Sequence, residues 1–373
     1  SACYRLGDQV LTGDTLHLGS CPPQVPVHLS DHAVPAMARE WTLRVLYGPH
    51  GAPDFFTPDD IDTFFATDWE VHYNSSRTGV RLIGPKPQWA RKDGGEAGLH
   101  PSNIHDNAYA IGAVDFTGDM PVILGPDGPS LGGFVCPVTI IDAELWKMGQ
   151  LRPGDRIRFH PVTLEQATAL AAARESAVRT LKASPALTLP DTATRGQPVV
   201  ATREATATHV GAAYRQAGDR YLLVEYGPLV LDLELRFRVH ALMTWIKAQG
   251  VPGLLDLTPG IRSLQFHFDP ALLPRDRLLA LLAQAEDELG AVDDMEVPTR
   301  IVHLPLSWDD AATRLAIERY MTAVRPDAPW CPSNIEFIRL GDGTTMSFSD
   351  FLAPPASAGS VAIGDATITE GNS

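Results

Sequence analysis

The chain has 373 residues, 44% of them hydrophobic and 20% charged, which is typical of a globular protein with two or three domains. Asp and Glu number 45 against 30 for Lys and Arg, so the formal net charge is −15, which disfavours nucleic acid and anionic membranes as partners. The four cysteines form no CxxC pair and no apolar stretch approaches the roughly 20 residues of a membrane span, so a soluble protein of the reducing cytoplasm is predicted.

Residues 1–162 are predicted to be mostly β. Short apolar or alternating runs, separated by Gly, Pro, Asp and Asn, indicate strands at 41–47, 80–83, 121–124, 134–141 and 156–159. Two short helices interrupt them: one has Thr57 as its N-cap and Pro58 in its first turn, and the other covers 142–149. Several strands with few helices favour a barrel or a sandwich.

A second unit follows an Ala-rich helix from Thr163 to about Lys182, with residues 183–205 predicted as linker. Between 206 and 305 the pattern predicts strands and helices in the order β-α-β-β-α-β, which is the split βαβ arrangement of a ferredoxin-like domain. The strands are expected at 221–226, 254–257, 262–268 and 299–304, and the helices at 232–249 and 274–289. The fold class is therefore α+β, mostly β, with a further region and a loose tail over 306–373.

The densest polar cluster lies between His100 and Asp115. It contains His105, Asp106 and Tyr109 beside several amide and hydroxyl groups. A few such groups on a rigid frame make a site for a small polar molecule. A long loop whose side chains bond their own backbone is the alternative, and composition alone favours it.

Ser130 lies in a GxSxG sequence at 128–132, the pattern of a hydrolase nucleophile elbow. That elbow needs a strand before the serine and a helix after it. Here a proline precedes Ser130 and a Gly-Gly strand pattern follows, so a hydrolase elbow is rejected. The sequence also has no phosphate-binding P-loop, GxGxxG or HExxH motif, and it predicts neither a nucleotide site nor a catalytic metal.

Arg77 and Arg81 are four residues apart in a strand-like segment, so alternation is expected to put both side chains on one side. Two such arginines can hold a carboxylate bidentately. They can equally pair with surface acids in so acidic a chain, and Arg262 has the same two explanations.

Several parts of the chain resemble one family, namely Ser75–Leu82, Gly112–Ile141, Leu145–Phe159, Gly218–Gly227 and Pro259–Leu264. They are similar to the paired allophanate hydrolase subunit 2 and subunit 1 domains. Fused in this order, these domains form the carboxyltransferase part of urea carboxylase and of its guanidine-using relatives. Residues 127–137 and 324–337 resemble the carboxylase branch in particular, and the resemblance covers about residues 4–340.

The resemblance implies a cyclophilin-like β-barrel for 1–162, followed by a subunit 1-like α/β domain for 206–305. Family members have a longer segment before the region that matches residues 1–20, and a second barrel after the α/β domain. The chain is therefore expected to be a fragment of a larger carboxyltransferase, with the start of the second subunit 1-like region after residue 305.

The activity that the resemblance implies is transfer of CO₂ from carboxybiotin to a substrate nitrogen, from urea to allophanate or from guanidine to carboxyguanidine. Biotin would arrive on a carrier domain, and ATP would be used by a biotin carboxylase domain, neither of which lies in this chain. Allophanate hydrolase or a carboxyguanidine-processing enzyme would act downstream, and no metal is required. The alternatives are an ATP-dependent 5-oxoprolinase subunit and a non-catalytic binding protein that resembles a kinase inhibitor.

The resemblance also implies roles for individual residues. His105 and Asp106 are expected to be catalytic, with one of them accepting the proton. The expected substrate-binding residues are His100, Tyr109, Asp115 and Ser130, and the expected cofactor-binding residues are Arg77, Arg81 and Arg262.

Asp115 bears on the choice of substrate. Because Val114 and Phe116 flank it, strand alternation turns Asp115 away from both, either into the pocket or into solvent. A carboxylate pairs with guanidinium, whereas an asparagine amide suits urea, so guanidine is favoured over urea.

Overall fold

The computed structural model describes residues 37–92, 95, 99–180, 195–206, 209–290 and 310–323, and five short strands nearer the termini. Of these, β1 (Cys3–Leu6) pairs with β2 (Gln9–Thr12), and β17 (Ile335–Arg339) lies between β18 (Thr345–Ser347) and β19 (Thr367–Glu370). The predicted strand at 299–304 and most of the motif at 324–337 lie outside the described residues. In the described part of the chain, no helix is long and apolar enough to cross a membrane.

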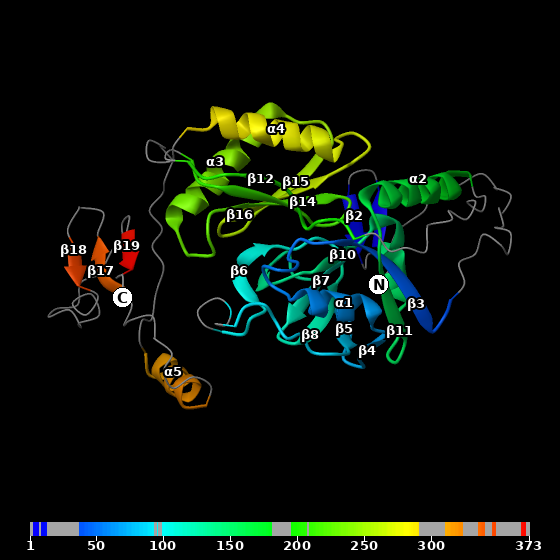
Figure 1. Cartoon of the computed structure of the whole chain (residues 1–373), viewed down its shortest axis with the longest axis horizontal. Coiled ribbons are helices and arrows are strands. Elements are labelled where there is room, and N and C mark those ends of the chain that lie inside the picture. The colour runs from blue at the N-terminus through cyan, green and yellow to red at the C-terminus, as the bar shows by residue number, and fades with distance from the viewer. Residues whose placement is uncertain are drawn as a thin grey trace.

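Seven strands of the first unit close into a barrel (Figure 1), which confirms the mostly-β prediction. They are β3 (Glu40–Tyr47), β4 (Trp69–Val71), β5 (Gly79–Ile83), β7 (Ala113–Thr117), β8 (Met120–Leu124), β10 (Val138–Ile140) and β11 (Arg156–Pro161). Their spatial order is β10-β3-β11-β4-β5-β8-β7, and β7 pairs with β10 to complete the ring. Strand β11 runs parallel to β3 and antiparallel to β4.

Aromatic side chains fill the barrel, because alternate residues of each strand point inward. Phe64, from helix α1 (Pro58–Ala66), stacks on Phe159 of β11 with ring centroids 4.9 Å apart. Phe116 of β7 and Trp69 of β4 belong to the same core and are almost fully buried. Burial of each large ring contributes on the order of 2–3 kcal/mol, so this core holds the barrel together.

Helix α1 begins as predicted, with Thr57 as its N-cap. The Thr57 hydroxyl accepts the N–H of Asp60 at 3.1 Å, and the Asp60 carboxylate accepts the N–H of Thr57 at 3.0 Å. The same carboxylate also accepts the N–H groups of Gln88 at 2.7 Å and Trp89 at 3.1 Å. One side chain therefore ties the start of α1 to the segment that precedes β6.

We expect Asp60→Ala to lower the free energy of unfolding by about 2 kcal/mol, because it removes the carboxylate half of the capping box and leaves the N–H groups of Thr57, Gln88 and Trp89 without their acceptor. Asp59→Ala is the matched control, since Asp59 is an exposed acid of the same turn. Its expected effect is below about 0.5 kcal/mol. Denaturant unfolding followed by tryptophan fluorescence measures both, and equal effects would contradict the anchoring role of Asp60.

Outside the barrel, β6 (Asn103–Ala108) pairs with β9 (Leu131–Phe134). The long loop that composition favoured over 100–115 is therefore wrong. His105 and Asn107 do not face solvent, because the second unit packs on β6, whereas the side chain of Asp106 between them is exposed. The 3₁₀ helix η3 (Asp142–Gln150) and helix α2 (Leu164–Thr180) confirm the other two predicted helices of this half.

The second unit is a five-stranded antiparallel sheet in the order β12-β13-β14-β16-β15. Its strands are β12 (Val199–Arg203), β13 (Ala212–Gln216), β14 (Tyr221–Tyr226), β15 (Leu254–Pro259) and β16 (Ser263–Phe268). Strand β16 lies between β14 and β15, which are joined by helix α3 (Leu233–Gln249), so the split βαβ unit is confirmed. Strand β13 occupies the place beside β14 that the fourth strand of a ferredoxin-like domain would take. Strand β12 comes from the segment predicted as linker.

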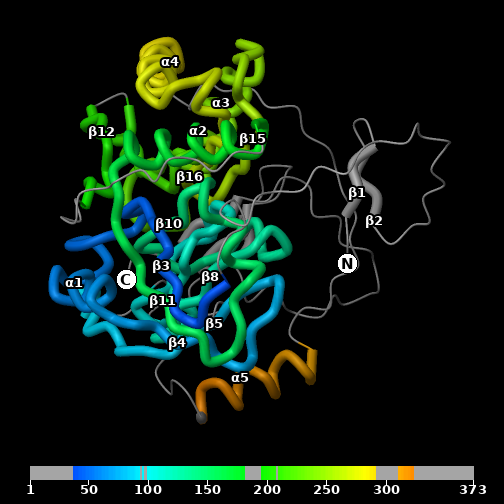
Figure 2. Tube along the Cα trace, turned by 90° about the vertical axis from the view of Figure 1, so that its right-hand side faces the viewer, coloured from blue at the N-terminus to red at the C-terminus, as the bar shows by residue number. Residues whose placement is uncertain are grey.

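Helices α3 and α4 (Arg275–Glu288) cover one face of this sheet, and the barrel lies on its other side (Figures 1 and 2). Helix α3 begins at Asp232, whose carboxylate accepts the N–H of Glu234 at 2.8 Å, and it ends at Gly250 with a left-handed φ of 56°. A further helix, α5, covers Ala311–Ala323. The sheet is thus a middle layer, with an apolar face toward the helices and a second face toward the barrel.

Candidate functional site at the interdomain seam

The sheet face that points to the barrel carries charged and polar side chains. On β14 and β16, Leu222, Val224 and Phe266 belong to the core under the helices, so the residues between them point the other way. The polar residues on the barrel side are Arg215, Glu225, Ser263 and Gln265, and all four are buried. We call the layer between this face, strand β6 and the loop at 48–50 the interdomain seam.

Glu225 is the centre of a buried ion network. Its carboxylate accepts from Arg215 Nε at 2.5 Å and from Arg262 Nη2 at 2.9 Å. Arg215 reaches across the seam to Pro49 O at 3.3 Å and to Asp54 at 3.2 Å. Burial alone would raise the pKa of Glu225, but the two guanidinium groups outweigh it and lower that pKa to about 2. The network therefore joins the two units through fixed charges.

His50 lies on the barrel side of this network and is fully buried. Its Nδ1 accepts the backbone N–H of Cys136 at 3.0 Å, so in the neutral ring the proton is on Nε2. Nε2 lies 4.0 Å from Glu225 Oε1 and has no hydrogen-bond partner among the described residues. Burial, reinforced by the neighbouring arginines, lowers the pKa of His50 to about 3. His50 is therefore a neutral donor at neutral pH.

Strand β6 meets the second unit at the turn before β16. The Asp106 carbonyl accepts the N–H of Ile261 at 2.9 Å. A Cβ on Gly260 would lie 2.4 Å from Ser263 Oγ and 2.6 Å from Asp106 O, so only glycine permits this approach. Of the two predicted catalytic residues, His105 is buried and the side chain of Asp106 is exposed. The structure thus brings β6, with both residues, next to the turn that carries Arg262.

A cleft of about 550 Å³ opens on the ion network, and its lining includes Asp54, Arg215, Glu225 and Arg262. The hydrogen bonds of Arg262 reach Glu225, Tyr226 O and Gly227 O. Arg215 and Arg262 thus each donate hydrogen bonds to three residues, and each guanidinium group has five N–H donors. The base of the cleft combines two cations with the buried carboxylate of Glu225 and the half-exposed carboxylate of Asp54, and the forked N–H groups of the two guanidinium groups suit a carboxylate ligand.

Asp115 is buried, only 3% exposed, so the solvent-facing alternative is wrong. As predicted, it points away from Val114 and Phe116, which lie in the barrel core. Thr117 Oγ1 is 3.4 Å from its Oδ2, and Oδ1 has no partner among the described residues. Burial raises the pKa of Asp115 to about 7. Its carboxyl lies near Cys136, whose thiol pKa it helps to raise.

The remaining predicted residues, His100, Tyr109 and Ser130, flank strands β6 and β9. Tyr109 is buried, and its hydroxyl accepts the N–H of Phe134 at 2.9 Å. Ser130 is exposed, and its carbonyl accepts the N–H of Tyr109 at 3.0 Å. His100 contacts Asp119 at 3.2 Å and Ser102 at 3.0 Å, an Asp-His-Ser order. Ser102 is fully buried and its hydroxyl accepts the N–H of Gly118, so no substrate reaches it.

Arg77 and Arg81 do not share a strand, because β5 begins only at Gly79. Arg77 lies in the preceding turn and pairs with Asp127 at 2.5 Å on the surface. Arg81 lies in register with Val122, which is in register with Asp115. The expectation that alternation places both arginines together is therefore wrong, and Arg262 is the predicted cofactor-binding residue that lies at the cleft.

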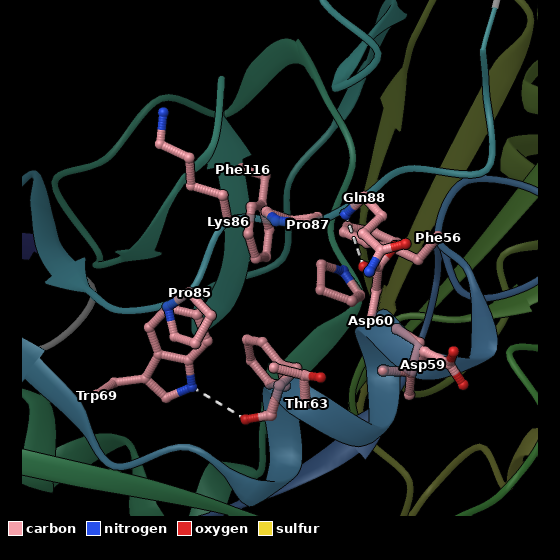
Figure 3. A pocket seen from close by; sticks show the side chains of 13 residues that line it. Phe56, Asp59, Asp60, Thr63, Trp69, Pro85, Lys86, Pro87, Gln88 and Phe116 are labelled. Carbon is pink, nitrogen blue, oxygen red and sulfur yellow. Dashed lines mark hydrogen bonds between the residues drawn. The ribbon is translucent and has the colours of Figure 1, made fainter.

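A second pocket, of about 240 Å³, lies beside α1 and contains none of the predicted site residues. Figure 3 shows rings of the barrel core, including Phe116 and Trp69, around it. Lys86 extends away from its centre and pairs with Asp119 at 3.3 Å. The Asp60 carboxylate accepts hydrogen bonds from backbone N–H groups. We therefore do not assign a catalytic role to this pocket.

His50, Arg215 and Glu225 were not predicted from the sequence. Arg215 and Glu225 each interrupt an otherwise apolar or small-residue strand, and a charged residue at a buried strand position needs a partner. The sequence therefore indicates that Arg215 and Glu225 need partners, but it does not indicate which residues of the other unit, such as Asp54, provide them. His50 lies in a Gly-Pro-His-Gly turn with no such signal.

Comparison with known proteins gives the family. The model described as carboxyltransferase domain, subdomain A and B, matches residues 4–161, and that for subdomain C and D matches residues 212–327. A urea amidolyase from Lachancea kluyveri is 44% identical over 304 residues, 80% of this chain and 17% of that protein. A urea amidolyase from Saccharomyces cerevisiae is 40% identical over 349 residues, 90% of this chain and 19% of that protein.

A solved structure agrees with the sequence matches. The urea carboxylase of Kluyveromyces lactis has a TM-score of 0.72 and 41% identity, covering 82% of this chain and 27% of that one. The chain thus spans 17% and 19% of the length of the two curated relatives above.

Proposed function

The chain belongs to the carboxyltransferase domain family found in urea amidolyases and urea carboxylases, and from that premise we propose that it transfers a carboxyl group from carboxybiotin to a nitrogen of a urea-like substrate. Urea would yield allophanate, and guanidine would yield carboxyguanidine. The observation that carries the proposal is the buried arginine pair at the cleft between the two matched units. The reaction forms an N–C bond and releases one proton from the nitrogen.

The residues at the cleft fit carboxybiotin. Glu225 and Asp54 balance the charges of Arg215 and Arg262, so the fit rests on the geometry of the two guanidinium groups, whose forked N–H groups match a carboxylate. When bound, carboxybiotin supplies the carboxyl group. The chain itself orients the substrate nitrogen, excludes water and accepts its proton. We assign the proton to Asp106, with His105 beside it on β6.

The other predicted residues have supporting places in this proposal. His100, Tyr109 and Ser130 shape the β6–β9 sheet that carries Asp106, and Arg81 lies on the same barrel face as Asp115. The partners we propose are biotin carboxylase and biotinyl carrier domains, with ATP used by the former. Allophanate hydrolase or a carboxyguanidine-processing enzyme would follow, and the four widely spaced cysteines, which form no CxxC pair, favour the cytoplasm.

Asp115 would decide between urea and guanidine through its protonation. With a pKa of about 7, its carboxyl is mostly neutral at pH 6 and mostly charged at pH 8. The neutral carboxyl can donate to the carbonyl of urea, whereas the carboxylate pairs with guanidinium, which carries donors only. The preference for guanidine over urea should therefore rise with pH.

Asp115→Asn should lower the ratio of kcat/KM for guanidine over urea at least about tenfold at pH 8, and less at pH 6. The folded-state pKa of Asp115 lies above its ordinary value of 3.8, so the parent protein loses stability as pH rises from about 4 to 7. The variant should therefore be more stable than the parent at pH 8. The exposed Asp127→Asn is the control for charge loss. A ratio at pH 8 equal to the parent's would remove Asp115 from substrate choice.

The proposed function is tested with the full-length protein that contains this chain. ATP, biotin, bicarbonate and one of urea, guanidine or 5-oxoproline are supplied, and ADP release is measured. We expect stimulation by urea or guanidine that depends on bicarbonate. Stimulation by 5-oxoproline without bicarbonate would favour an oxoprolinase, and no stimulation by any of the three would favour a binding protein.

A further inference from the structure

We propose that Asp54 competes with the carboxylate of the ligand for the Arg215 guanidinium group, so that the ligand binds and leaves by exchange with Asp54. This inference rests on the proposed carboxyl transfer, which brings a carboxylate to the cleft. Asp54, Arg215 and Glu225 all line the cleft of about 550 Å³. Arg215 donates through Nη2 to Asp54 at 3.2 Å and through Nε to Glu225 at 2.5 Å.

The two carboxylates on Arg215 differ in how readily they can leave it. The Glu225 side chain is 4% exposed and is shared with Arg262, so its departure would leave buried cations unpaired. The Asp54 side chain is 51% exposed, and its bond to Arg215 is the longer of the two. Water hydrates an exposed carboxylate that leaves its partner, so such a pair contributes little free energy. Asp54 is therefore the carboxylate that an incoming one can replace.

Release of Asp54 needs only a rotation of its side chain. The next residue, Phe55, is buried, its N–H donates to Gly51 O at 3.1 Å, and its carbonyl accepts the N–H of Ala90 at 3.1 Å. These contacts fix the backbone beside Asp54. An exposed side chain changes rotamer within picoseconds to nanoseconds, so the carboxylate can turn into water without any movement of strands.

Arg215 keeps its position when Asp54 turns away. Glu225 holds Nε, Pro49 O accepts from Nη1 at 3.3 Å, and the Phe55 ring centroid lies 5.6 Å from Cζ. Nη2 is then a donor for the ligand carboxylate. Because one carboxylate replaces another, the charges of the two guanidinium groups stay balanced throughout. Once the ligand has lost its carboxyl group, Asp54 returns to Arg215 and favours release.

Ligand-observed NMR on the full-length protein tests the exchange, with butyrate as a small carboxylate probe. Asp54→Asn removes the competing charge, so we expect the dissociation constant of butyrate to fall about fivefold, the upper range for a partly exposed ion pair. Asp54→Glu keeps a competing carboxylate and should leave the constant close to the parent's. Butyramide, the neutral analogue of the probe, should bind Asp54→Asn more weakly than butyrate does.

The matched control is Asp62→Asn. Asp62 also pairs with an arginine, Arg195, at 2.5 Å and its side chain is 62% exposed, but it lies on α1 outside the lining of the cleft. This variant should bind butyrate with the dissociation constant of the parent. An equal gain in affinity in Asp62→Asn and Asp54→Asn would overturn the inference, because it would reflect net charge alone.

The direction of the change separates competition from a structural role. An unchanged dissociation constant in Asp54→Asn would overturn competition, and a larger one would show that Asp54 holds Arg215 in place. Absence of butyrate binding to Asp54→Asn would overturn the inference as well. ADP release stimulated by urea or guanidine is measured separately on the parent protein. If it is absent while Asp54→Asn binds butyrate more tightly, the carboxyl transfer fails and the exchange stands.

Discussion

Asp106→Asn is expected to lower urea-dependent carboxyl transfer at least about 100-fold, while bicarbonate-dependent ATP cleavage on the biotin carboxylase domain stays intact. A positioned base contributes typically 10²–10⁴-fold, and an asparagine amide cannot accept the proton that the substrate nitrogen loses. The contact of Asp106 with the second unit is through its backbone carbonyl, to Ile261 N, which the substitution preserves. The fold should therefore survive the change.

The measurement uses the two partial reactions of the full-length protein side by side. Asp59→Asn is the control, because it makes the same chemical change at an exposed residue of α1. Selective loss of transfer in Asp106→Asn alone supports its role as proton acceptor. Parallel loss of both activities would show damage to the fold or to the coupling between domains, and full retention of transfer would leave His105 to be tested.

Glu225→Gln is expected to lower the free energy of unfolding by about 3–5 kcal/mol, because it leaves two buried guanidinium groups without their shared carboxylate. The folded-state pKa of about 2 lies below the ordinary value of 4.5. The stabilisation is therefore present above about pH 4.5 and is lost as the pH falls toward 2. The variant should show a flatter loss of stability in acid than the parent.

The control for this prediction is Asp287→Asn. Asp287 also pairs with an arginine, Arg203, at 2.9 Å, but its side chain is 70% exposed. Its loss should cost less than about 1 kcal/mol. Thermal unfolding of each variant between pH 3 and 8 is the measurement. Equal midpoints for Glu225→Gln and the parent at pH 7 would contradict the bridging role.

Local features were predictable from the sequence, and features that depend on the seam were not. The cap at Thr57 and the end of α3 at Gly250 depend on residues within a turn of each boundary, so their patterns are complete in a short window. Strand β6 was missed because its polar residues, such as Asn107, are buried by a unit that begins about a hundred residues later. Composition alone favoured a loop over this segment.

The candidate site shows the same difference between local features, which were predictable, and long-range contacts, which were not. Arg262 was singled out, but its partner Glu225 lies 37 residues before it and is found only when β14 and β16 pair. Arg77 was placed on a strand that starts two residues too late to include it. Burial of Asp115 was one of two open alternatives, and its pKa of about 7 depends on the packing around it.

The position of β11 has a consequence for synthesis of the protein. Strands β3 (residues 40–47) and β4 (residues 69–71) do not pair with each other, because β11 (residues 156–161) lies between them and pairs with both. During synthesis β11 emerges about a hundred residues after β3. A nascent or truncated chain that stops before residue 161 therefore exposes two open strand edges, which are templates for pairing with other chains. Expression fragments of the first unit should aggregate when they end short of Pro161 and fold when they continue past it.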